Sequence, residues 1–129
     1  MQNLITTTGD LHFGDNPEVM KNADPRHRAW VEVDPSAIEA NASIIKRSLS
    51  GKCLLMAVVK ADGYGHGAET VARAALEGGA NNLGVATLQE GIELRKAGLE
   101  CSILVLGNLT NLEDLSSCLQ WNLMPTLSS

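Results

Sequence analysis

The chain has 129 residues, of which 44% are hydrophobic and 19% are charged, and its formal net charge is −5 at pH 7. This is the composition and length of one ordinary globular domain, and the negative charge with scattered basic residues argues against a nucleic-acid-binding surface. No apolar stretch approaches the roughly 20 residues of a membrane span, and the N-terminus lacks the basic start and apolar core of a signal peptide.

Residues 1–27 have no sustained periodicity, and we predict a loosely ordered N-terminal tail there. From residue 28 to residue 129, segments with strand and helix periodicity alternate. Strands are predicted at 29–33, 53–59, 83–86, 102–106 and 123–127, and helices between Asp34 and Gly51, at 68–77, from Thr87 to Gly98 and at about 110–119. Strands that alternate with helices indicate right-handed βαβ units and a parallel sheet. The units recur roughly every 22 to 25 residues, which suits a (β/α) barrel as well as a doubly wound sheet.

Two of these helices have clear start signals. Asp34 is a suitable N-cap with Pro35 at the first helical position, and Thr87 with Glu90 three residues later forms a capping box. In the helix predicted from Thr87 to Gly98, we otherwise interpret the charged residues as a solvated face, namely Glu90, Glu93, Arg95 and Lys96.

The three cysteines are widely spaced and lie in or next to apolar segments, at Cys53, Cys101 and Cys118. Their odd number and spacing favour reduced thiols in the core over a disulfide framework or a zinc site. We therefore expect a cytoplasmic protein without a metal.

The most informative feature is Lys60, which ends the apolar run 53–59. Parallel α/β sheets place their chemistry at the C-terminal ends of the strands, so Lys60 is delivered to that edge. Partial burial removes water from an amine and favours its neutral form, the nucleophile that forms a Schiff base with a carbonyl cofactor. A lone lysine at a strand end more commonly extends to solvent, and only the residues after Lys60 favour the catalytic interpretation.

The loop that follows Lys60 reads Ala-Asp-Gly-Tyr-Gly-His-Gly. Its three alternate glycines allow unusual φ angles and a close approach of the backbone to a ligand, and Tyr64 adds a phenolic hydroxyl. The spacing is neither a dinucleotide-binding fingerprint nor a P-loop. His66 could act as a base, but its glycine neighbours favour a hydrogen-bonding role in the loop, and Asp62 is expected to cap the loop backbone.

The run Val-Val-Lys-Ala-Asp-Gly-Tyr-Gly-His-Gly resembles the pyridoxal-phosphate attachment motif of alanine racemases. The resemblance covers roughly residues 30–129 and continues in order through segments 30–34, 72–80, 84–91 and 103–107. The lysine motif is highly specific, whereas the later segments alone are only suggestive. Gly63 stands where many members of the family carry alanine.

The resemblance implies a fold-type-III enzyme with a TIM-barrel-type domain that interconverts L-alanine and D-alanine and supplies D-alanine for cell-wall peptidoglycan. It implies that Lys60 carries pyridoxal 5'-phosphate as a Schiff base and is the base that acts on the D-enantiomer. Tyr64 matches the family tyrosine that approaches the cofactor, through its phosphate. Full-length members of the family are homodimers.

A complete barrel needs about 250 residues, so this chain holds about the first half of one and lacks the family's C-terminal β domain. The second base of the family is a tyrosine from the C-terminal domain of the partner subunit, and Tyr64 is the single tyrosine here. We therefore expect a truncated chain that is inactive alone. The alternatives are a non-catalytic pyridoxal-phosphate-binding barrel module and an inactive fragment.

Overall fold

The structure is a computed structural model that describes residues 5–6 and 31–128. The chain divides into two units, Met1–Pro35 and Ser36–Ser129. In the first unit, strand β1 (Ile5–Thr6) pairs antiparallel with strand β2 (Glu32–Val33). The predicted strand at 29–33 is thus present at its C-terminal end. Apart from β1, the predicted tail at 1–27 lies outside the described residues, and its boundary at residue 28 stays a prediction.

The second unit contains a four-stranded parallel sheet in the order β3-β4-β5-β6. Its strands are β3 (Met56–Val58), β4 (Asn82–Val85), β5 (Ser102–Asn108) and β6 (Met124–Thr126). Its helices are α2 (Pro35–Ser48), whose first residue belongs to the first unit, α3 (Lys60–Gly65), α4 (Ala68–Glu77), α5 (Leu88–Lys96) and α6 (Leu112–Gln120). Each strand follows its sequence neighbour across the sheet, and no strand changes direction. This succession is that of a (β/α) barrel, because a doubly wound sheet reverses its strand order at a switch point.

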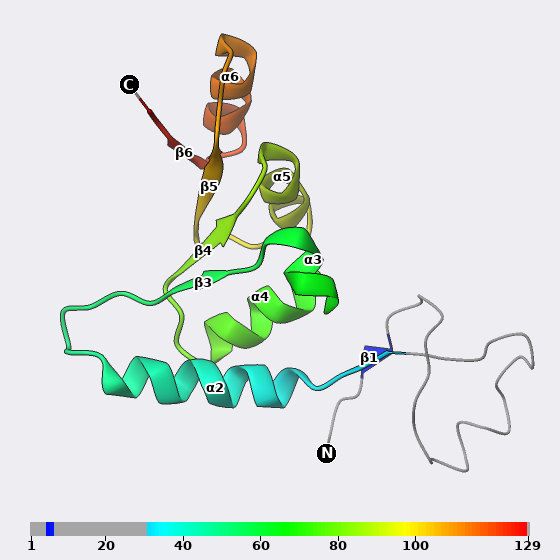
Figure 1. Cartoon of the computed structure of the whole chain (residues 1–129), viewed down its shortest axis with the longest axis vertical. Coiled ribbons are helices and arrows are strands. Elements are labelled where there is room, and N and C mark those ends of the chain that lie inside the picture. The colour runs from blue at the N-terminus through cyan, green and yellow to red at the C-terminus, as the bar shows by residue number, and fades with distance from the viewer. Residues whose placement is uncertain (1–4, 7–30, 129) are drawn as a thin grey trace, which may run out of the picture. The chain divides into compact units, whose positions relative to one another are not determined.

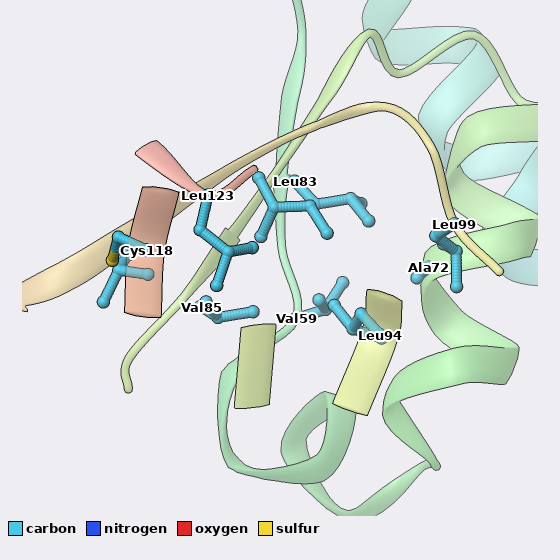
Figure 2. Packing of buried hydrophobic residues seen from close by; sticks show 10 residues of the cluster. Val59, Ala72, Leu83, Val85, Leu94, Leu99, Cys118 and Leu123 are labelled. Atoms are coloured by element: carbon cyan, nitrogen blue, oxygen red, sulfur yellow. The ribbon is translucent and has the colours of Figure 1, made fainter. Parts of the chain in front are cut away.

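One face of the sheet is covered by α4, α5 and α6, which lie on the same side in Figure 1. Side chains alternate along each strand, so every second residue points toward these helices. Figure 2 shows the resulting core of buried side chains, whose members are Val59, Ala72, Leu83, Val85, Leu94, Leu99, Ile103, Val105, Cys118 and Leu123. Each large apolar side chain buried there stabilises the fold by about 1.5–3 kcal/mol.

The opposite face of the sheet carries a row of residues that the strand register aligns. Val58 pairs with Gly84, Gly84 with Leu104, and Leu104 with Met124. In a closed barrel this face points to the interior. In the described part of this chain Val58 and Met124 remain 38% and 41% exposed.

The helix boundaries follow local signals in the sequence. Helix α4 spans the predicted residues 68–77, and the predicted capping box of α5 is confirmed: Thr87 Oγ1 accepts from the Glu90 N–H while the Glu90 carboxylate accepts from the Thr87 N–H. Within residues 31–128, no helix is both long enough and apolar enough to cross a bilayer.

The cysteines occupy three different environments. Cys118 is buried in the core as expected, and Cys101 is half-buried, but the expectation of a core position is wrong for Cys53, which is exposed because the strand begins only at Met56. Burial raises the pKa of the Cys118 thiol, and the Asp114 carboxylate raises it further.

Candidate functional site

Lys60 is separated from the end of β3 by Val59 alone and lies at the C-terminal edge of the parallel sheet. The residue before it, Val59, is fully buried and donates its N–H to the Gly84 carbonyl at 2.8 Å, so the chain is still held to β4 at this point. Lys60 itself is half-buried. The structure therefore places the predicted lysine at the sheet edge where the sequence predicted it.

The segment after Lys60 is a left-handed helical turn, which the sequence did not predict. Ala61, Asp62, Gly63 and Tyr64 all have φ between 52° and 61°, and the Gly63 N–H donates to the Val59 carbonyl at 3.0 Å. For residues other than glycine this conformation costs about 1–2 kcal/mol each. Such backbone strain is maintained only when surrounding contacts hold it, and it concentrates at functional sites.

Gly63 is the buried residue of this turn. Its φ is +61°, and an added Cβ would lie 2.8 Å from Val71 Cγ2 on α4. The glycine therefore lets the turn rest directly on α4.

The polar residues of the turn stabilise its backbone. Asp62 Oδ1 accepts from the Ala68 N–H at 2.8 Å, at the start of α4, which confirms the predicted capping role. His66 Nδ1 lies 3.0 Å from the Gly63 carbonyl oxygen, as expected for a hydrogen-bonding residue of the loop.

Tyr64 follows Lys60 within the same six-residue segment, and its side chain is 58% exposed. The turn therefore brings the amine-bearing residue and the phenol-bearing residue to one edge of the sheet.

Sequence reasoning missed the position of Glu90, which we interpreted as part of a solvated helix face. Its side chain is half-buried, and its Oε1 accepts from the Ala61 N–H at 2.8 Å. Its Oε2 accepts from the N–H groups of Ala86 and Thr87 at 2.7 and 3.1 Å. The capping box pointed to the contact with Thr87, but no signal in the sequence pointed to Ala61, which lies 29 residues away.

Arg95 also departs from the predicted solvated face. Its guanidinium is half-buried and donates to main-chain carbonyls before β5 and β6. By contrast, Glu93 is exposed and accepts from the Gln89 amide, and Lys96 is exposed near the Trp121 ring, in agreement with the prediction.

An apolar floor lies beside the lysine-bearing end of β3. A Cβ added at Gly84 would lie 3.4 Å from both Met56 Sδ and Val58 Cγ2, and 3.5 Å from Leu106 Cδ1. Gly84 thus keeps this surface shallow between partly exposed apolar neighbours, and Leu106 is 41% exposed. A flat aromatic ring is chemically compatible with such a floor.

A separate pocket of about 490 Å³ opens at the C-terminal ends of β4 and β5. Its lining includes Thr87, Asn108 and Asp114, and it includes neither Lys60 nor Tyr64.

The fold and the site define a parallel (β/α)-barrel-type domain with a lysine and a strained turn beyond the C-terminal end of β3. The family described as "Alanine racemase, N-terminal domain" matches residues 33–129. The chain belongs to this family.

Individual relatives agree with this assignment. The chain is 70% identical to an alanine racemase of Prochlorococcus marinus over 110 residues, which cover 85% of this chain and 28% of that protein. It is 50% identical to alanine racemase 2 of Bacillus subtilis over 100 residues, 78% of this chain and 25% of that one. The chain therefore spans about a quarter of the length of these relatives.

Solved structures agree as well. The crystal structure of alanine racemase from E. faecalis matches with a TM-score of 0.72 and 41% identity, over 75% of this chain and 26% of that one. The Bacillus anthracis enzyme, solved with bound L-Ala-P, matches with a TM-score of 0.69 and 38% identity, over 72% and 24% of the two chains. These matches confirm the TIM-barrel-type fold.

Proposed function

We propose that this chain is the cofactor-anchoring part of a pyridoxal-phosphate-dependent alanine racemase. The observation that carries the proposal is the placement of Lys60 at the C-terminal edge of the sheet, followed by a strained turn that only dedicated contacts maintain. Membership of the alanine racemase family supports the same activity.

The residues at this edge fit pyridoxal 5'-phosphate. The Lys60 amine would hold the cofactor through its aldehyde group. The floor around Gly84 suits one face of the pyridine ring, and the exposed Tyr64 hydroxyl is a donor for the phosphate. Bound pyridoxal phosphate supplies an electron sink for the negative charge left when a proton leaves the α-carbon.

In this proposal Lys60 has two roles. Its Nζ would hold the cofactor, and the same Nζ, when free, would take the α-proton from D-alanine. Return of a proton to the opposite face of the α-carbon gives L-alanine, and no atom changes its oxidation state. Tyr64 orients the cofactor through the phosphate and does not exchange protons with the substrate.

The opposite face needs a second base, and we propose that it comes from a partner subunit of a homodimer, as the family resemblance implies. Tyr64 is the single tyrosine of the chain, so these 129 residues are expected to hold the cofactor without racemising alanine. Alanine as the substrate, D-alanine supply for peptidoglycan and a cytoplasmic location rest on the family alone.

The test is to incubate the chain with pyridoxal phosphate and to reduce the C=N bond to a stable amine with sodium borohydride. We expect the label on Lys60 in peptide mass spectrometry. Lys60→Arg should lose it, whereas Lys52→Arg, at an exposed lysine eight positions earlier, should keep it. Labelling of Lys60 no greater than that of Lys52 in the folded chain would refute the proposal.

A racemisation assay separates the enzyme from a non-catalytic pyridoxal-phosphate-binding module. We expect no D-alanine from the chain alone, and D-alanine production from L-alanine once a polypeptide that supplies the rest of the barrel and the family's C-terminal domain is added. A labelled chain that stays inactive with this complement would instead indicate the binding module.

A further inference from the structure

The carboxylate of Glu90 joins two parts of the site that are far apart in the sequence. One oxygen accepts from the Ala61 N–H, at the first peptide after Lys60, and the other accepts from Ala86 and Thr87 at the start of α5. All three donors are main-chain groups. An ionised carboxylate only accepts hydrogen bonds and can serve several donors at once, so its chemistry matches this position.

The left-handed turn makes this contact important. Ala61 is the first residue with a positive φ, and a turn of this hand costs free energy at each residue with a Cβ. The Ala61 N–H points to no main-chain acceptor among the described residues and is bound by Glu90 instead. Asp62 secures the far end of the turn at Ala68, so two carboxylates hold the turn from its two ends.

We propose that Glu90 is a positioning residue for Lys60. By fixing the Lys60–Ala61 peptide to the N-terminus of α5, it sets the direction in which the Lys60 side chain leaves the backbone. The inference rests on the proposed role of Lys60 as cofactor anchor and adds a residue that does not itself touch the cofactor. Reactivity at the lysine then depends on a helix that begins 28 residues later, at Leu88.

Two substitutions separate positioning from helix capping. Glu90→Gln keeps one oxygen, which can continue to accept from Ala86 and Thr87, but it turns an NH₂ group toward the Ala61 N–H. Glutamine is also accepted at this position of a capping box, so α5 keeps its cap. Thr87→Ala removes the hydroxyl that accepts from the Glu90 N–H and leaves the carboxylate bonds in place.

Two measurements are made on the full chain and on both variants. The first is the rate of borohydride-fixed pyridoxal phosphate attachment at Lys60, normalised to Lys52 in the same sample. The second is hydrogen exchange of the Ala61 amide relative to that of Gly63, which needs no cofactor. We expect Glu90→Gln to slow attachment about tenfold and to speed Ala61 exchange by a similar factor. Thr87→Ala should lower stability and leave both ratios within about twofold of the unaltered chain.

Equal attachment and equal Ala61 exchange in Glu90→Gln and the unaltered chain would overturn the inference, as would losses of the same size in Thr87→Ala. If the unaltered chain takes no cofactor at Lys60, the proposed function fails. In that case the exchange at Ala61 still decides whether Glu90 holds the lysine-bearing peptide.

Discussion

Arg95 shows how a single side chain joins loops that the sequence separates. Its guanidinium donates to the carbonyls of Leu99, Cys101, Trp121 and Asn122. These carbonyls lie in the turns that lead into β5 and β6. The planar fork of arginine can serve several acceptors at once, which a lysine ammonium at the same place does less well.

We predict that Arg95→Met lowers the free energy of unfolding by about 2–4 kcal/mol, because several partly buried carbonyls lose a charged donor. Arg95→Lys should recover part of the loss. The measurement is the urea midpoint at low protein concentration, with Arg47→Met as the matched control. Arg47 is exposed, its guanidinium donates to the Ser43 hydroxyl, and its loss should change stability by about 0.5 kcal/mol or less. Equal effects of the two Met substitutions would contradict this role of Arg95.

At the level of elements, the sequence predicted what local signals determine. Helix α4 matched its predicted bounds because glycines flank it on both sides, and α5 matched its predicted start because Thr87 and Glu90 form a capping box. The left-handed turn at 61–64 was not predictable in the same way. Its glycine pattern allowed positive φ, and a capping role for Asp62 was predicted, but Ala61 also adopts positive φ and is held by Glu90. That contact joins residues 29 positions apart and leaves no local signature.

Gly78 controls the contact between α2 and α4. A Cβ at this position would lie 2.3 Å from the Glu39 carbonyl oxygen and 2.7 Å from Ala42 Cβ, so α2 could no longer pack closely on the end of α4. The cost of overpacking at a backbone contact is about 1–3 kcal/mol.

We therefore predict that Gly78→Ala lowers the urea midpoint and detaches α2, with faster hydrogen exchange at Ala42. Gly51→Ala is the control, because a Cβ there meets nothing within 4 Å. It should be neutral, and an equally mild Gly78→Ala would show that α2 does not need this contact.

For the whole molecule, the alternation of strands and helices predicted the parallel sheet, but it did not distinguish a barrel from a doubly wound sheet. The strand order decided between them, because it depends on pairing between segments about 20 residues apart and not on periodicity within a segment. The position of Lys60 at the sheet edge was predictable from the sequence, because the strand and the glycine loop that determine it are adjacent to it in the chain.

The same order leaves β3 and β6 at the edges of the sheet. On the face opposite the helices, Val58 and Met124 remain exposed apolar side chains. Unpaired strand edges and exposed apolar patches promote association between chains. Helix α6 adds Leu112 and Leu119, which are 83% and 82% exposed and lie two turns apart on one face. We therefore predict that a polypeptide of these 129 residues self-associates as its concentration rises.

Sedimentation velocity over a concentration series tests this prediction. Leu112→Lys with Leu119→Lys should shift the chain toward monomer, because burying two new ammonium groups between chains is costly. Ser116→Lys with Gln120→Lys adds the same two charges at exposed polar positions of α6 and should change association less. If charge alone caused the shift, both pairs would act equally. A single cooperative melting transition from a monomer at every concentration would show that the sheet face opposite the helices and the sheet edges do not drive association.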